Sequence, residues 1–268
     1  MTIRPLNKIN KIRMERKMTK KIMVIFFISA LMLTSCSTLS NIGIGGGKSV
    51  SEELDLQEIV AEPTEAVISD SKFYRDELED DPSKNWGLRV ISGLEKQLIW
   101  SQLSGKMRLQ TLPPNDLNVI FFNKNNNYDD VIVQAEVENF GPIDNAFSLI
   151  CRASEAGWYE FRISSSGYYE LLRFDQYKKD EGKNAYTNFV EKRLNSTKIM
   201  AGLEKNIFAL SCVDSTISAF VNGEQLYFEK RPLAIEDDTY TDGTIGFGIL
   251  GFGKELDTTY NWVEAVKP

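Results

Sequence analysis

Short segments in which apolar and polar residues alternate recur from residue 131 to the end of the chain. The clearest of them are 131–137, 147–151, 159–163, 168–174, 217–221, 224–228, 244–250 and 260–266. A period of two places successive side chains on opposite faces of a β-strand. Clusters of Gly, Asn, Asp and Pro separate the segments, and no long amphipathic helix pattern interrupts them. The pattern predicts an all-β domain over residues 73–268, large enough for one core between two antiparallel sheets.

Two of the separators are turn signals. Asn222-Gly223 lies between 217–221 and 224–228, and this dipeptide is the one that tight two-residue hairpins favour. A Ser-Ser-Ser-Gly sequence separates 159–163 from 168–174 in the same way. Both places are predicted to be strand–turn–strand units.

The N-terminal part has a different pattern. Lys20 and Lys21 precede a twelve-residue apolar run, 22–33, that is too short to span a bilayer but typical of an export signal. Met14 and Met18 are alternative starts to Met1. The sequence Leu-Thr-Ser-Cys that ends at Cys36 resembles the lipobox of bacterial lipoproteins, with Ser in place of the commoner Gly or Ala. The resemblance implies cleavage before Cys36 and acylation of its thiol, so residues 1–36 are interpreted as a lipoprotein signal peptide.

Residues 37–72 contain a glycine cluster and an acidic stretch without aromatic residues until the domain begins. Such a composition predicts a disordered tether between a lipid on Cys36 and the domain. Without residues 1–36, the chain keeps 23 of its 31 basic and 37 of its 38 acidic residues, a net charge of −14. This charge argues against nucleic acid as a partner. We expect the domain to lie on the extracytoplasmic side of a membrane in the bacterial cell envelope.

The domain resembles the concanavalin A-like (laminin-G-like) jelly-roll superfamily. Within it, the resemblance is to exported bacterial domains grouped with family 16 glycoside hydrolases and to the 3-keto-disaccharide hydrolase-type domain. The matching segments, in chain order, are 150–152, 158–163, 167–173, 220–223 and 242–247. The resemblance implies a two-sheet antiparallel sandwich with one curved sheet, whose open face receives carbohydrate in many relatives.

The residues that could carry chemistry are restricted by the absence of histidine, which excludes Ser-His-Asp and Cys-His catalysis and His-ligated metals. Family 16 enzymes use Glu-x-Asp-x-x-Glu on one strand. A literal match occurs at 53–58, but it lies in the acidic tether, where its carboxylates would be solvated. Solvated carboxylates do not differ enough in their surroundings for one to act as the acid and another as the base. The segment is therefore interpreted as a charged linker. The domain contains no equivalent motif, so no catalytic residue is predicted.

Two cysteines remain if Cys36 carries lipid. Cys151 and Cys212 both end a Phe-x-Leu-x-Cys sequence, so alternation turns each thiol toward the core. A disulfide between them would close a loop of 60 intervening residues and contribute about 3–4 kcal/mol in an oxidising compartment. The alternative is a pair of separate buried thiols.

Ligand contacts are predicted on the opposite face of the same strands. If Phe147 and Phe161 face the core, then residues on the other face could stack on sugar rings and bind their hydroxyls. The candidates are Arg152, Trp158, Arg162 and Arg173. The alternative is a solvated sheet with cross-strand charge pairs such as Glu160 with Arg173.

No cofactor is predicted, although calcium occurs in parts of the superfamily. The loop carboxylates that could bind it are Asp144, Asp237, Asp238 and Asp242. They lack a recognised ligand spacing, and ordinary turn formation is the alternative.

Together these features favour a lipid-anchored, extracytoplasmic module that binds carbohydrate without catalysis. A sugar-processing enzyme such as a glycoside hydrolase is one alternative. A structural or protein-binding envelope lipoprotein is the other.

Overall fold

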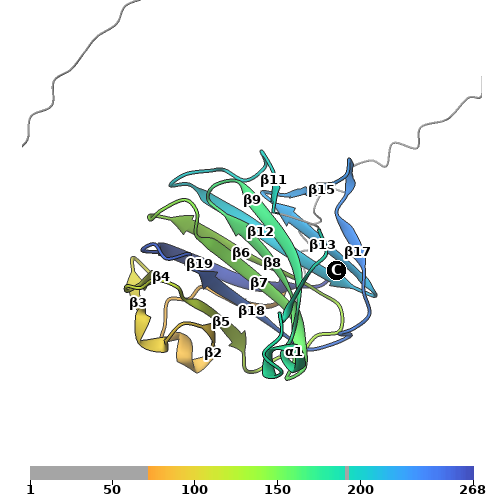
Figure 1. Cartoon of the computed structure of the whole chain (residues 1–268), viewed down its shortest axis with the longest axis horizontal. Helices are drawn as coiled ribbons and strands as arrows, with labels where there is room; N and C mark the ends of the chain where they lie inside the picture. The colour runs from red at the N-terminus through yellow and green to blue at the C-terminus, as the bar shows by residue number, and fades with distance from the viewer. Residues whose placement is uncertain (1–71, 191–192) are drawn as a thin grey trace, which may run out of the picture. The chain divides into compact units, whose positions relative to one another are not determined.

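The computed structural model describes residues 72–190 and 193–268, and these residues form two antiparallel β-sheets packed face to face (Figure 1). The signal peptide, Cys36, nearly all of the tether and the acidic motif at 53–58 lie outside the described residues.

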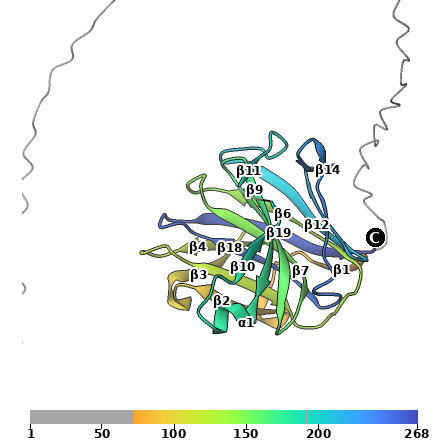
Figure 2. The same ribbon diagram turned by 45° about the vertical axis from the view of Figure 1, so that its right-hand side comes forward.

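Sheet A has nine strands and follows the order β14-β13-β12-β6-β19-β4-β3, with β1 added on β19 and β17 on β13. Figure 2 shows β3 and β14 at opposite ends of this sheet. Its strands are β1 (Lys72–Asp76), β3 (Leu98–Leu103), β4 (Lys106–Thr111), β6 (Val131–Asn139), β12 (Lys205–Val213), β13 (Thr216–Val221), β14 (Glu224–Gln225), β17 (Ala234–Glu236) and β19 (Asp257–Val266).

Sheet B has eight strands in the order β10-β9-β8-β7-β18-β5-β2, with β11 added on β9. Its strands are β2 (Trp86–Ser92), β5 (Asn118–Asn123), β7 (Ala146–Ala153), β8 (Gly157–Ser164), β9 (Tyr168–Asp175), β10 (Tyr186–Asn188), β11 (Leu194–Asn195) and β18 (Thr244–Leu250).

The remaining elements are short. They are a two-stranded ribbon of β15 (Tyr227–Phe228) and β16 (Arg231–Pro232), the helix α1 (Gln176–Asp180), and two 3₁₀ turns at Pro82–Lys84 and Glu95–Gln97. Among the described residues, no helix has the length and apolar character needed to cross a membrane.

The alternating segments form strands as predicted, with one correction. Asn222 and Gly223 adopt positive φ values of 52° and 84° and join β13 to β14, which confirms the hairpin. The segment 224–228, however, is not one strand. Leu226 turns into the core and is fully buried, after which β15 leaves sheet A to pair with β16.

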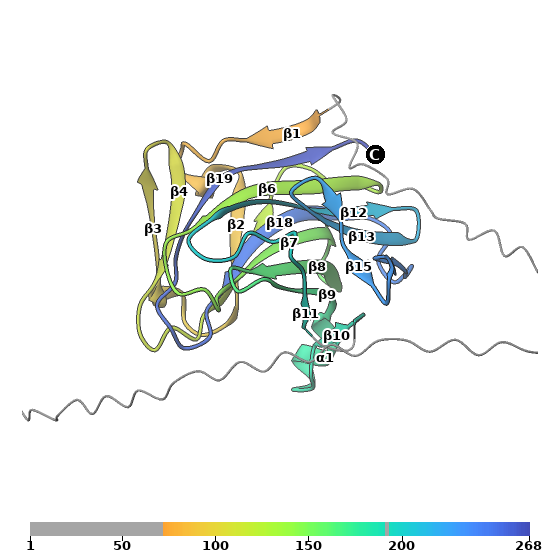
Figure 3. The same cartoon turned by 90° about the horizontal axis from the view of Figure 1, so that it is seen from above.

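The main core lies between the two sheets, which Figure 3 shows as two layers. Sheet B contributes Phe161 and Cys151, and sheet A contributes Phe208 and Cys212. The rings of Phe161 and Phe208 lie 6.0 Å apart between their centroids. Cys151 and Cys212 form a disulfide with a Cα–Cα distance of 6.6 Å. The predicted bridge is therefore confirmed, and it joins one sheet to the other.

Candidate ligand-binding site

The outer face of sheet B, which points away from sheet A, carries a second and smaller apolar core. Every residue of β7 and β8 is buried, on both faces of the strands. On the outer face, Trp158 stacks on Phe174 with 3.8 Å between ring centroids. The buried members of this cluster are Ile120, Ile150, Ala153, Trp158, Phe174 and Ala185. The face that the sequence predicts to be open is thus largely covered.

The cover is the segment 176–190, which contains α1 and β10. Figure 3 shows α1 on the side of sheet B that faces away from sheet A, and β10 is the edge strand of sheet B beside β9. The ring of Tyr186 lies 4.4 Å from the guanidinium of Arg162 and 5.0 Å from the ring of Phe174. At the far side, the ammonium of Lys179 donates to the carbonyl of Ile91 on β2 at 2.5 Å. The chain's own side chains therefore close the middle of this face.

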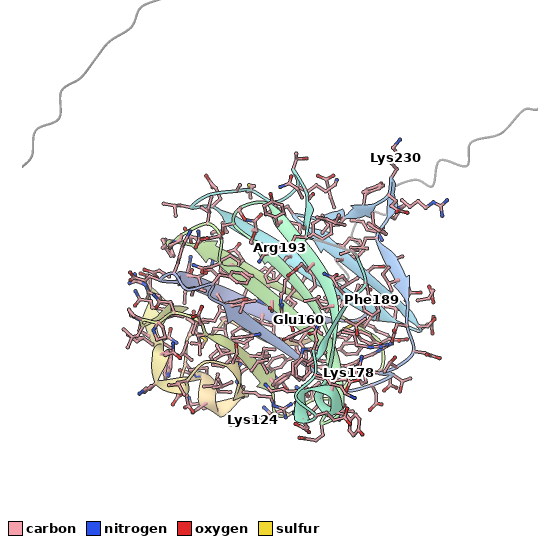
Figure 4. The ribbon with its side chains drawn as sticks, viewed as in Figure 1. Lys124, Glu160, Lys178, Phe189, Arg193 and Lys230 are labelled. Carbon is pink, nitrogen blue, oxygen red and sulfur yellow. A yellow bond between two sulfur atoms is a disulfide. The ribbon has the colours of Figure 1, made fainter. Side chains whose placement is uncertain are left out.

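Glu160 lies beneath this cover, near the centre of the view in Figure 4. Its Oε1 accepts hydrogen bonds from Ser148 Oγ at 2.8 Å and from Arg162 Nε at 2.5 Å. Its Oε2 accepts a hydrogen bond from the indole nitrogen of Trp158 at 3.1 Å. Both carboxylate oxygens thus have donors, as a buried charge requires.

Electrostatics favour the charged form of Arg162. Burial disfavours its charge, but the carboxylate of Glu160 and the nearby Tyr186 and Glu170 outweigh burial and raise the pKa of Arg162. Burial first, and then the charge of Glu160, raise the pKa of the Tyr186 hydroxyl. Glu160 is therefore balanced by a permanent positive charge.

Arg173 lies elsewhere, so the charge pair of Glu160 with Arg173, which the alternative of a solvated sheet included, does not form. Arg173 is opposite Tyr159 in the register of β8 and β9, and its side chain extends to the connection between β17 and β18. There its Nη1 donates to Asp237 Oδ2 and to Thr239 Oγ1, both at 2.5 Å. Burial opposes ionisation of Asp237, but hydrogen bonds from Tyr159 and Thr239, together with Arg173, lower its pKa.

Arg152 also departs from the predicted outer face. Its φ is +51°, at a place where the register of β7 and β18 shifts. This local distortion turns the guanidinium to the end of the sandwich, where it donates to the carbonyls of Asp129 and Tyr240 and to the carboxylate of Asp130. Of the four predicted contacts, only Trp158 and Arg162 lie together, and Arg152, Trp158 and Arg162 are all buried.

An open pocket of about 330 Å³ remains beside the covered part of the same face. It is lined by Arg89, Phe122, Asn127, Ala153, Ser154, Glu155, Asp242, Gly243 and Thr244. The guanidinium of Arg89 lies 5.4 Å from the ring centroid of Phe122 and 5.8 Å from that of Trp158. Its Nη2 is 3.6 Å from a carboxylate oxygen of Glu155. Cation–π contacts thus hold Arg89 beside Phe122, which lines the pocket, and beside Trp158 of the covered cluster.

The backbone holds two further polar residues in place. Tyr128 and Gly243 exchange hydrogen bonds, with the Tyr128 amide donating at 2.8 Å and the Gly243 amide at 3.1 Å. Gly243 has a φ of +149°, and a Cβ there would lie 2.5 Å from the carbonyl oxygen of Ala153. A side chain would not fit this approach. The bridge sets Asn127 and Asp242, the residues preceding each partner, beside the pocket.

The loop aspartates considered as calcium ligands form ordinary protein contacts where the structure shows them. Asp144 pairs with Lys254 at 2.6 Å, and Asp237 pairs with Arg173. Asp242 lines the pocket. The described residues contain no group of three or more acidic or cysteine side chains that could hold a metal ion.

The sequence did not single out most of the pocket. Asp242 is a candidate calcium ligand and belongs to the segment 242–247 of the family resemblance, whereas Arg89, Asn127 and Glu155 lie outside the clear alternating segments. The only available signal was the resemblance at 242–247, which contains both Asp242 and Gly243.

Comparison with solved structures shows which fold this arrangement belongs to. No protein-family profile and no curated protein matches the sequence. A family 16 endo-glucanase from Bacteroides ovatus, solved in complex with G4G3G-2F-DNP, is similar over 72% of this chain and 99% of its own, with 8% identity and a TM-score of 0.52. A β-1,3-1,4-glucanase (lichenase) derived from a mouse hindgut metagenome is similar over 72% and 98%, with 14% identity and a TM-score of 0.51. A β-glucanase from Bacillus licheniformis is similar over 73% and 98%, with 15% identity and a TM-score of 0.50. These likenesses confirm the predicted two-sheet jelly-roll fold.

Proposed function

We propose that this chain is a lipid-anchored carbohydrate-binding module of the cell envelope, and that the open pocket on sheet B holds a glycan without cleaving it. The fold is shared with proteins named as glucanases. The pocket combines what a sugar requires, because it is lined by the planar polar groups of Arg89, Asn127 and Asp242 together with the apolar ring of Phe122. Its volume is at the small end of the range for ligand pockets, so it fits one or two sugar units of a longer chain.

The observation that carries the choice of binding over hydrolysis is the state of the carboxylates on this face. Hydrolysis of a glycosidic bond requires one carboxylic acid that keeps its proton and a second carboxylate. Glu160 is buried against Arg162 and covered, so a sugar cannot reach it in this conformation. The two carboxylates that line the pocket, Glu155 and Asp242, are both exposed, so the pocket contains no buried acid paired with a second carboxylate.

The anchor is the second part of the proposal. Cys36 follows an apolar run in the pattern of a lipobox, and several acyl chains on one cysteine would hold the chain stably at a membrane. Residues 37–72 would then separate the domain from the lipid. A tether of this kind suits a module that collects glycan outside the cell membrane.

Binding to mixed-linkage β-1,3-1,4-glucan, measured with the full chain by calorimetry and affinity electrophoresis, tests the proposal. Asp242→Asn and Arg89→Met should each weaken binding by about tenfold or more, because each removes a charged hydrogen-bonding group from the pocket. Asp238→Asn is the matched control, since Asp238 is exposed in the same connection but does not line the pocket. Binding that all three variants retain would exclude this pocket.

Two further readouts distinguish the alternatives. Release of reducing sugar from the glucan would identify a hydrolase instead of a binding module. Failure to bind any member of a broad glycan array would favour the alternative function, a structural or protein-binding lipoprotein of the envelope. For the anchor, Cys36→Ala should move the chain from the membrane fraction to the soluble fraction, and unchanged partitioning would exclude lipidation at this residue.

A further inference from the structure

A small hollow lies on sheet B at the other end of β7 from the open pocket. Its volume is about 10 Å³, which is room for one oxygen atom. Ala146 at the start of β7 lines the hollow, whereas Ala153 at the end of the strand lines the open pocket. At about 3.3 Å per residue, the two sites are about 23 Å apart. The other residues that line the hollow include Arg162, Ser164, Tyr168, Glu170 and Arg193.

Strand register places an arginine on either side of Glu170. Arg162 on β8 is opposite Glu170 on β9. Leu194 of β11 is opposite Tyr169 across the other edge of β9, so Arg193, labelled in Figure 4, comes next to Glu170. The Nε atom of Arg193 is 3.8 Å from a carboxylate oxygen of Glu170, longer than a hydrogen bond, and the Arg193 side chain is 40% exposed. Such a loose surface pair contributes little, so a ligand can compete for Arg193.

Hydrogen-bond donors exceed acceptors at this hollow. Arg162 donates to Glu160 through Nε, but its Nη2 has no hydrogen-bond partner among the described residues, although Arg162 is only 8% exposed. A buried donor without a partner is costly, and a charged one more so. The single carboxylate among the lining residues belongs to Glu170, because Glu160 does not line the hollow. A ligand that suits this hollow therefore has to supply acceptors.

A carboxylate is the acceptor that two guanidinium groups favour, since it is planar and has two oxygens. A water molecule would pair with Arg162 alone, whereas a carboxylate can direct one oxygen to each arginine. Two exposed rings accompany the arginines. Tyr168, which lines the hollow, and Phe252, whose ring centroid is 4.6 Å from the guanidinium of Arg193, are each 40% exposed. Such rings provide surfaces on which a sugar can stack.

We propose that this hollow is a second ligand site, which binds the carboxylate group of an acidic sugar within a glycan. One carboxylate oxygen pairs with Nη2 of Arg162 and the other pairs with the guanidinium of Arg193. The choice of a glycan rests on the proposed function of the chain. The hollow and its residues, however, are separate from the open pocket, so either site can be disproved without the other.

Calorimetric titration of the full chain with polygalacturonate, a polymer of acidic sugars, tests the site. Salt at about 150 mM, where the Debye length is about 8 Å, limits repulsion between the polymer and the acidic chain. Arg193→Met should weaken binding by about tenfold or more, because it removes a charged donor. Arg193→Lys should restore only part of the affinity, since an ammonium group keeps the charge but not the planar N–H groups. Lys106→Met is the matched control: Lys106 also forms a long ion pair, 3.6 Å from Glu138, but it lies on β4 of sheet A.

The neutral mixed-linkage β-glucan separates this site from the open pocket, because Arg193→Met should leave glucan binding unchanged. A native chain that binds glucan but not polygalacturonate would overturn the second site alone. A chain that binds polygalacturonate but not glucan would exclude the open pocket and support the second site.

Two further results would overturn the proposal. Equal losses from Arg193→Met and Lys106→Met would show a general effect of charge. Acetate that displaces the polymer as well as galacturonate does would show that the hollow takes any carboxylate and does not recognise a sugar. Circular dichroism would establish that each variant is folded.

Discussion

At the scale of single residues, Glu160 and Arg162 place opposite charges in a part of sheet B that excludes water. Glu160 is fully buried, and Arg162 is nearly so. Removing one partner from such a pair leaves an uncompensated charge, whereas replacing both by apolar groups costs much less. Comparing the stability of the single and the double variant therefore shows whether the two charges only neutralise each other or stabilise the fold by their attraction.

We expect Glu160→Gln to lower the free energy of unfolding by about 3 kcal/mol, because Arg162 keeps its charge without a partner. Urea denaturation followed by circular dichroism would measure the change. Glu170→Gln is the control, since Glu170 is only partly buried, and its contact with Arg193 at 3.8 Å should contribute less than about 1 kcal/mol. Glu160→Met combined with Arg162→Met should be less damaging than Glu160→Gln alone. A double variant as unstable as the sum of its single variants would contradict this account.

At the scale of elements, the segment 176–190 covers the outer face of sheet B through few side chains, while its strand β10 is held by backbone pairing with β9. No residue of α1 is buried, and the side chains that contact the outer face are those of Ala185, Tyr186 and Lys179. The ring of Tyr186 is central, because it contacts both Arg162 and Phe174. This segment therefore depends on one aromatic side chain more than on its helix.

Tyr186→Ala should therefore cost about 2 kcal/mol of stability and make Trp158 accessible to solvent. Fluorescence quenching by acrylamide would report the change, because Trp158 is fully buried in the native chain. Tyr177→Ala is the control within the same segment: Tyr177 is 70% exposed, so its removal should change stability by less than about 0.5 kcal/mol. Equal quenching in the native chain and both variants would show that Tyr186 does not hold the cover in place.

The elements also show where sequence patterns were sufficient. β6 alternates between buried and half-buried positions over its whole length, so its period of two was visible. β5 is buried on both faces and β3 is exposed on both, so neither alternates and neither was predicted as a strand. The cover over sheet B was hidden for another reason. Glu160 and Arg162 are polar, so the alternating pattern predicts that they face solvent. The contacts that allow their burial depend on a strand register that the sequence does not reveal.

At the scale of the whole molecule, the two-sheet architecture was predictable, whereas the pocket was not. The fold follows from alternation and turns, which are local. The pocket brings together Arg89, Phe122, Glu155 and Asp242, which are distant in the sequence and meet because β2, β5, β7 and β18 are neighbours in sheet B. Strand order is a property of the complete fold, so residues that meet through it leave no short motif.

The disulfide links the fold to the compartment in which the chain works. Cys151 and Cys212 join the two sheets across 61 positions of sequence, so reduction should lower the free energy of unfolding by about 4 kcal/mol through the greater entropy of the unfolded chain. Urea denaturation with and without reductant measures this loss, and the variant with Cys151→Ala and Cys212→Ala should show no effect of reductant. Because the cytoplasm keeps thiols reduced, the proposed export of the chain predicts that the bridge forms only in exported chains. Alkylation and mass spectrometry should find Cys151 and Cys212 blocked in the exported chain. The same cysteines should be reactive in a variant without residues 1–36 that stays in the cytoplasm. Reactive thiols in the full-length chain as well would contradict export to an oxidising compartment.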